Sequence, residues 1–358
     1  MKFTLFGYPK TGKTTLFNLL TGARVETKSY AGVKEEPHLR TCPVPDRRLE
    51  KIHSLYPEKN KKPAVMDYID LAGAAYGEIK EASYLNVLRK TEGLVHVARG
   101  FRDPGIPHPK DRISPENDIH AMEEELILAD LMLTENRLEK LEKELQRDKT
   151  AEGVQEKELL DRIKRSLEEG RAVREMELPE SGEKLLRSFA FLSQKPLLHV
   201  INVDEDDIEL IETPEKITTT SRKNTKIMAF CGKIELEITE LEGEEKTVFM
   251  EEYGLKELSA SRFMRSCYDL MNVITYFTIG KDEVKSWTIQ KDATALEAAG
   301  RIHSDIAAGF IRAEVIAWEK LMEKEGFQPA RDSGDVRLEG KEYRVQDGDV
   351  IYFRFSKP

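Results

Sequence analysis

The chain has few cysteines and no long apolar run, and both absences narrow what it can be. It contains three cysteines among its 358 residues, and an odd, widely spaced set predicts neither a disulfide framework nor a zinc site. No apolar stretch reaches the roughly eighteen residues that span a bilayer, so no membrane insertion is expected. Residues 2–6 resemble a strand and lack the features of a secretory signal, so the sequence predicts a cytoplasmic protein.

Surplus positive charge is also lacking. Lys and Arg number 56 against 66 Asp and Glu, which gives a net charge of -10. Because binding to nucleic-acid phosphates needs extra Lys and Arg, this balance argues against a protein that coats nucleic acid, and no DNA partner is predicted. Local basic faces are compatible with it. A chain of this length is too long for one ordinary core, so two or three domains are expected.

Short apolar runs alternate with helical segments, a pattern typical of an α/β fold with a parallel sheet. The intervening stretch, residues 117–147, carries apolar residues at coiled-coil spacing, in a register that slips midway. A second apolar stripe follows before Pro179. These stripes predict an antiparallel helical hairpin inserted into one nucleotide-binding domain. Strands are expected at residues 2–7, 64–71, 94–101, 196–203 and 226–231.

After residue 273 the pattern changes to short strands around one helix near residues 293–307, which suits a compact β-grasp module. Its strands are expected at residues 276–279, 284–289 and 350–355. The predicted domains are a P-loop nucleotide-binding domain (residues 1–116 and 196–272), an inserted helical coiled-coil hairpin (117–195) and a C-terminal β-grasp domain (273–358).

The strongest motif matches G-x-x-x-x-G-K-[ST] and lies between a strand-like and a helix-like run. Its glycines let backbone amides cradle phosphates, and the following helix adds its dipole. Lys13 is the expected catalytic lysine, which neutralises β- and γ-phosphate oxygens, while the Thr14 hydroxyl takes a magnesium position. The residues expected to bind nucleotide here are Gly7, Tyr8, Pro9, Lys10, Thr11, Gly12, Lys13, Thr14 and Thr15.

A D-x-x-G tetrapeptide follows at the end of another apolar run, with Asp70 and Gly73 at its ends. In a P-loop protein this places a carboxylate near the magnesium shell and a glycine where the γ-phosphate can be sensed. The tetrapeptide alone also describes a plain turn, but the P-loop upstream favours the functional interpretation. The sequence thus predicts Mg²⁺ held by Thr14 and Asp70.

The base is expected at a later strand end, at Asn202 to Glu205. A guanine-specific enzyme would carry N-K-x-D there, with an aspartate that accepts hydrogens from the guanine edge. Val203 and Glu205 replace two of these residues, whereas Asn202 can still bond a purine edge, including the adenine amino group. ATP is therefore the predicted substrate, and GTP the alternative. The next loop is expected to pack its backbone beside the base, through Cys231, Gly232 and Lys233.

These motifs resemble the Obg-like ATPase family, also called YchF, over essentially the whole chain. The P-loop is similar to that family's G-x-P-x-x-G-K-[ST]-T-L-F-N, and residues 202–205 fit its N-x-x-E. Residues 275–278, 309–315 and 347–350 resemble its TGS domain. The resemblance implies an α/β P-loop NTPase of the G-domain type with an inserted coiled-coil hairpin and a C-terminal β-grasp TGS domain. It also implies a switch protein that prefers ATP and acts on the ribosome or RNA.

Departures from the family pattern fall on the switch segments. The family's first switch reads roughly F-P-F-x-T-x-x-P, whereas residues 30–37 read Y-A-G-V-K-E-E-P, so Lys34 stands where a magnesium-facing threonine is expected. Ala74 occupies the position at which most related GTPases place a water-orienting glutamine, which predicts slow turnover. A nucleotide-binding, ribosome-associated scaffold with little hydrolysis is therefore a further alternative.

Lys10 stands where the family commonly has an asparagine that can help to hold a potassium ion beside the phosphates. We hypothesise that its ammonium group replaces this ion, or stabilises charge between the β- and γ-phosphates as a catalytic group. The alternative is a lysine that points to solvent.

Aromatic residues of the C-terminal module are candidates for stacking on RNA bases. Core packing is the more common role for β-grasp aromatics, and it is the role we expect. The residues concerned are Tyr276, Phe277, Trp287 and Phe310.

Overall fold

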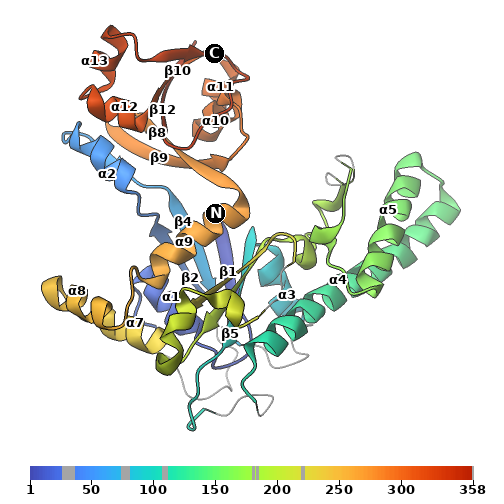
Figure 1. The fold of residues 1–358 in the computed structure, drawn as a ribbon. Helices are drawn as coiled ribbons and strands as arrows, with labels where there is room; N and C mark the ends of the chain where they lie inside the picture. The colour runs from blue at the N-terminus through green and yellow to red at the C-terminus, as the bar shows by residue number, and fades with distance from the viewer. Residues whose placement is uncertain are drawn as a thin grey trace. The chain divides into compact units, whose positions relative to one another are not determined.

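The computed structural model describes residues 1–25, 37–73, 81–106, 112–179, 182, 185–218 and 222–356. The chain forms two compact units, each built from two stretches of sequence (Figure 1). The first unit comprises Met1–Thr41 and Asp67–Ser266, and the second comprises Cys42–Met66 and Cys267–Pro358. Within the described part of the chain, no helix combines the length and apolar character needed to cross a bilayer.

The first unit is an α/β domain around a six-stranded sheet in the order β2-β4-β1-β5-β6-β7. Strand β1 pairs in parallel with β4 and β5, β5 with β6, and β6 with β7. Strands β5 and β6 are buried along their whole length, which explains their unbroken apolar sequences. The strands are β1 Lys2–Phe6, β2 His38–Pro43, β4 Val65–Asp70, β5 Gly93–Arg99, β6 Leu197–Asn202 and β7 Thr225–Phe230.

The helices of the first unit include a long antiparallel pair, α4 and α5 (Figure 1). Arg137 pairs with Glu156 at 2.6 Å and Glu135 with Lys164 at 3.0 Å. Because the residue numbers fall along one helix as they rise along the other, the two helices run in opposite directions. The helices are α1 Lys13–Thr21, α3 Ala82–Arg89, α4 Pro115–Arg147, α5 Ala151–Glu168, α7 Gly232–Thr239 and α8 Gly243–Glu252, and α9 Ser259–Met271 leads into the second unit.

Helix α4 changes its packing partner along its length. Its first half, including Met122 and Leu126, packs in the core beside the sheet. Its second half, including Leu138 and Leu141, packs with α5 side chains such as Leu160. This change of partner rotates the buried face and explains the slip of the apolar stripe in the sequence.

The second unit has its own six-stranded sheet in the order β11-β10-β12-β8-β9-β3. Strands β8 and β9 are antiparallel, as are β10 and β12, while β12 and β8 are parallel. The single helix expected near residues 293–307 is interrupted at His303, whose ring accepts a hydrogen bond from the backbone N–H of Asp305 and caps α11. The elements are α2 Arg47–Ser54, β3 Asn60–Lys62, β8 Val273–Ile279, β9 Glu283–Gln290, α10 Ala295–Ile302, α11 Ser304–Ala308, β10 Phe310–Ala317, α12 Trp318–Glu323, α13 Phe327–Asp332, β11 Arg337–Glu339 and β12 Asp349–Phe355.

The second unit takes in a segment that the sequence placed in the nucleotide-binding domain. We expected residues 1–116 to stay together, whereas Cys42–Met66 groups with the C-terminal residues. Strand β3 pairs with β9, and Leu49 of α2 lies in the same core as Phe277. Arg48 bonds Asp46 and also Asp347, which is 299 positions away. Contacts between such distant residues leave no periodic signal in the sequence.

Replacing Arg48 with alanine should destabilise the second unit selectively. The change removes the half-buried guanidinium between Asp46 and Asp347, and loss of one partner in a charged hydrogen bond costs about 1–3 kcal/mol. In the full chain, amide hydrogen exchange should become faster in β8 and β12 and stay unchanged in β5 and β6. Arg47→Ala, at the exposed neighbouring position, is the matched control. Equal exchange in both variants would contradict this account of α2.

Candidate functional site

The P-loop runs from the end of β1 to the start of α1 along a backbone that only some residues can follow. Gly7 has a φ of 138° and Gly12 a φ of 96°. A Cβ atom on Gly7 would lie 2.7 Å from the Val97 carbonyl oxygen, and one on Gly12 would lie 2.3 Å from Nδ2 of Asn202. Lys10 has a φ of 60°, a region that asparagine enters more readily than lysine. The backbone at position 10 therefore has a conformation that would suit the asparagine commonly found there in the family that the sequence resembles.

The predicted phosphate and magnesium groups lie together at this loop. Nζ of Lys13 is buried and donates a hydrogen bond of 2.6 Å to the Tyr8 carbonyl oxygen. Oγ1 of Thr14 donates to Oδ2 of Asp70 at 2.7 Å, and Asp70 is itself buried. A hydroxyl and a carboxylate side by side are the hard oxygen ligands that Mg²⁺ takes beside nucleotide phosphates. The two residues therefore fit the predicted ion.

Gly73 approaches the P-loop closely. A Cβ atom on Gly73 would lie 2.6 Å from the backbone N and Cα of Pro9 and 2.9 Å from Nζ of Lys13. This position beside Lys13 is the one expected for a glycine that senses a γ-phosphate. Tyr84 of α3, which no motif indicated, also lies near the loop. Burial raises the pKa of its hydroxyl, and the nearby Gly7 backbone opposes this shift.

The altered switch residues identified from the sequence, Lys34 and Ala74, lie outside the described residues. The expectations about them stay predictions.

Asn202, at the end of β6, connects the P-loop to the loop expected beside the base. Its Nδ2 donates to the Thr11 carbonyl oxygen at 3.3 Å, and its Oδ1 accepts from the Gly232 N–H at 3.0 Å. The side chain is only 6% exposed. Asn202 thus positions both loops, and the predicted contact with the base would use its second N–H or its second lone pair.

The two expected base loops are also linked at the surface. Nζ of Lys233 lies 2.7 Å from Oε1 of Glu205, and both side chains are exposed. An exposed ion pair contributes little to stability, so it can open when a nucleotide enters. Val203 and Cys231 are buried beneath these loops.

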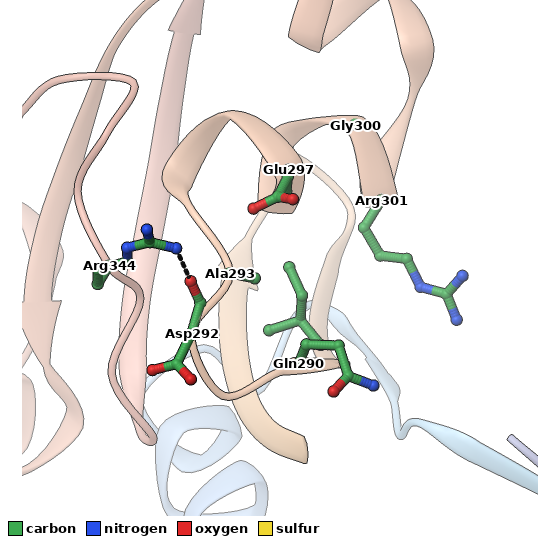
Figure 2. A pocket seen from close by; sticks show the side chains of 8 residues that line it. Gln290, Asp292, Ala293, Glu297, Gly300, Arg301 and Arg344 are labelled. Carbon is green, nitrogen blue, oxygen red and sulfur yellow. Dashed lines mark hydrogen bonds between the residues drawn. The ribbon is translucent and has the colours of Figure 1, made fainter. Parts of the chain in front are cut away.

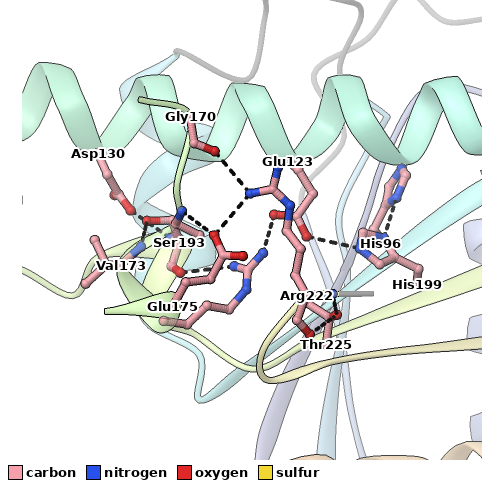
Figure 3. Close-up of polar contacts among 12 residues, drawn as sticks. His96, Glu123, Asp130, Gly170, Val173, Glu175, Ser193, His199, Arg222 and Thr225 are labelled. Atoms are coloured by element: carbon pink, nitrogen blue, oxygen red, sulfur yellow. Dashed lines mark hydrogen bonds and ion pairs between the residues drawn. The ribbon is translucent and has the colours of Figure 1, made fainter. Parts of the chain in front are cut away.

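Behind the P-loop, a buried chain of polar side chains joins β5 and β6 to α4 (Figure 3). Nδ1 of His96 is 3.1 Å from Nδ1 of His199, whose Nε2 is 3.3 Å from Oε1 of Glu123. Glu123 also pairs with Arg174. Burial lowers the pKa of His199 although Glu123 opposes the shift, so the ring is neutral. If Nε2 of this neutral ring donates to Glu123, Nδ1 must accept, and His96 is the donor. His96 in turn lies beside Gly7.

The second unit has a separate open hollow of about 520 Å³ beside α10 (Figure 2). Arg344 and Arg301 line it together with Asp292 and Glu297, and Arg344 donates to the Asp292 carbonyl oxygen. Because two arginines and two acidic residues line this hollow, it has no excess of positive charge that would attract a phosphate. It shares no residue with the P-loop site.

Comparisons with known proteins agree with this arrangement. The family YchF-GTPase_C, described as a protein of unknown function, matches residues 273–356, and a family described as a 50S ribosome-binding GTPase matches residues 2–148. The protein named "Ribosome-binding ATPase YchF" from Bacillus subtilis is 39% identical over 360 residues, which cover 98% of each chain. The chain belongs to the YchF family. The Escherichia coli O157:H7 protein of the same name is 36% identical over 361 residues, or 99% of each chain.

A solved structure shows the YchF fold in another member. The structure of the Schizosaccharomyces pombe YchF GTPase matches with a TM-score of 0.83, at 24% identity, and covers 99% of this chain and 97% of that one. At this identity the match speaks for the fold alone. The predicted family and the α/β P-loop fold are confirmed. The individual site residues of this YchF chain stay predictions, as do the domain boundaries apart from the placement of Cys42–Met66.

The environment of Lys13 predicts that nucleotide binding takes up protons near pH 8. Burial lowers the pKa of Lys13 to about 8, and the Asp70 charge opposes this shift. Phosphate oxygens favour the charged amine, so its pKa rises in the complex. Affinity should therefore be full below pH 8 and decline as the pH rises above about 8.

Calorimetric titration with ATP at pH 8 in two buffers of different ionisation enthalpy measures this uptake directly. The wild type should give buffer-dependent heats. A Lys13→Arg variant that still binds should give none, because arginine stays charged. Equal heats for the wild type in both buffers would show that Lys13 is already protonated in the free protein.

Proposed function

We propose that this chain is a nucleotide-dependent switch protein that binds ATP with Mg²⁺, hydrolyses it slowly and acts on the ribosome. The observation that carries the proposal is the convergence of Lys13, Gly73 and the Thr14–Asp70 pair at one P-loop. The relatives' name, a ribosome-binding ATPase, supports both ATP and the ribosomal partner. A ribosomal partner also supports a cytoplasmic location.

The chain's own groups supply binding and charge stabilisation. The P-loop amides and the start of α1 bind the phosphates, and Lys13 neutralises the β- and γ-phosphate oxygens. Thr14 and Asp70 would hold Mg²⁺, which when bound neutralises phosphate charge and orients the transferred group. Because the residue after Gly73 is alanine, it cannot orient water as a glutamine does, and hydrolysis is slow.

Lys10 is proposed to take the place of a potassium ion at the phosphates. Lys10 lies within the P-loop and has a left-handed backbone with a φ of 60°. Hydrolysis should then proceed equally in potassium and sodium buffers, as measured by phosphate release. Acceleration by potassium of several-fold would exclude this role for Lys10.

The choice between adenine and guanine is tested by calorimetric titration of the nucleotide-free protein with ATP and GTP analogues in magnesium. ATP should bind more tightly. Asn202→Ala removes both bonds that connect Thr11 and Gly232, so its ATP affinity should fall by roughly tenfold or more. Asn86→Ala, at an exposed position, is the control. Equal or tighter binding of GTP would instead identify a GTPase of the same fold.

A further inference from the structure

One part of the sheet in the second unit brings charged, apolar and aromatic side chains into register on neighbouring strands. Glu314 of β10 stands opposite Leu338 of β11 and Tyr352 of β12. In the next row on the same face, Arg312 stands opposite Arg354. Leu338 is 60% exposed and Tyr352 48% exposed.

This face carries more positive than negative charge. Glu314 is buried and pairs with both Arg331 and Arg354. One carboxylate thus neutralises only one of the two guanidinium charges that it pairs with. Arg312 adds a further positive charge, because it is exposed opposite Arg354. Like charges directly opposite on neighbouring strands are destabilising. The Arg312–Arg354 pair therefore lowers the stability of the folded unit, and an anionic partner would relieve this repulsion. The excess stands out in a chain with a net charge of -10.

The Tyr352 ring is held in place and left accessible. Its centroid lies 6.4 Å from that of Phe327 at an interplanar angle of 56°, and the Arg331 guanidinium lies 6.0 Å from it. The aromatics expected to pack in the core behave differently: Tyr276, Phe277 and Phe310 are buried, which confirms their core role, and Trp287 is partly buried. Tyr352 therefore offers the stacking surface that these rings do not.

We propose that the Tyr352 face, made of Arg312, Arg331, Tyr352 and Arg354, binds a single-stranded segment of RNA. A base stacks on Tyr352, and the flanking phosphates pair with Arg312 and Arg354. Duplex RNA keeps its base faces within the helix, so it offers the ring nothing to stack on. The inference rests on the proposed ribosomal function and deepens it, because it names the surface that contacts ribosomal RNA and the form of that RNA.

Fluorescence anisotropy of a labelled ten-nucleotide oligoadenylate, titrated with the full-length chain, tests the proposal. The single strand should bind more tightly than its duplex with oligouridylate. Tyr352→Leu, which keeps apolar bulk without a ring, should weaken binding by roughly tenfold, and Tyr352→Phe should retain it. The double variant Arg312→Gln with Arg354→Gln should reduce the slope of log affinity against log salt by about 1.4.

Controls separate the proposed surface from unfolding and from general charge. Arg301→Gln, at an exposed arginine of the hollow beside α10, should bind as the wild type does. Amide exchange of β10 and β12 should show that each variant is folded. Oligoglutamate should compete poorly, because it has charge but no bases. Tighter duplex binding, equal competition by oligoglutamate, or wild-type affinity in folded Tyr352→Leu would overturn the proposal.

Ribosome co-sedimentation of the wild type, with a non-hydrolysable ATP analogue, tests the proposed ribosomal function separately from the proposed RNA-binding surface. If the chain pellets with ribosomes but does not prefer single-stranded RNA, the Tyr352 face is wrong and the proposed function stands. If the chain does not pellet with ribosomes, the ribosomal function itself fails, and with it the argument that this face meets ribosomal RNA.

Discussion

The nucleotide site depends on the two hydrogen bonds of the Asn202 side chain. They connect the Thr11 carbonyl oxygen of the P-loop to the backbone N–H of Gly232, and so fix the phosphate loop against the loop expected beside the base. The approach is close enough that Gly12 cannot carry a Cβ atom, and a Cβ on Gly232 would lie 2.9 Å from the Thr15 side chain. The ends of β1, β6 and β7 and the starts of α1 and α7 are therefore positioned together. A buried amide with a donor and an acceptor can make this link, whereas an apolar side chain of similar size cannot.

The chain passes from the first unit into the second and back before it reaches Asp70. After the first switch segment, the chain enters Cys42–Met66, contributes α2 and β3 to the second unit, and returns along β4. Strand β4 begins at Val65 in the second unit and ends at Asp70, beside Thr14. The carboxylate predicted to face magnesium is thus the last residue of a strand whose first residues belong to the other unit.

Local patterns predicted much of this structure. The glycine and lysine spacing of the P-loop, Asp70 at a strand end and the apolar runs of the parallel sheet are short-range signals, and the ends of the predicted strands agree with the observed ones to within three residues. Strands β2, β3, β10 and β11 were not predicted. The contact of Arg48 with Asp347 and the His96–His199–Glu123 chain join segments far apart in sequence, and no spacing rule connects them. Tyr352 was missed for a related reason: which aromatic faces outward depends on strand register and on where helices cover the sheet.

Single-turnover phosphate release tests the central claim most directly, by comparing the wild type with Lys13→Ala at ATP concentrations that saturate each protein. The account predicts slow hydrolysis by the wild type that clearly exceeds the variant, because Lys13 neutralises charge at the β- and γ-phosphates. Tight ATP binding by the wild type with a rate equal to that of the variant would contradict it. The chain would then be a nucleotide-binding scaffold rather than a hydrolysing switch.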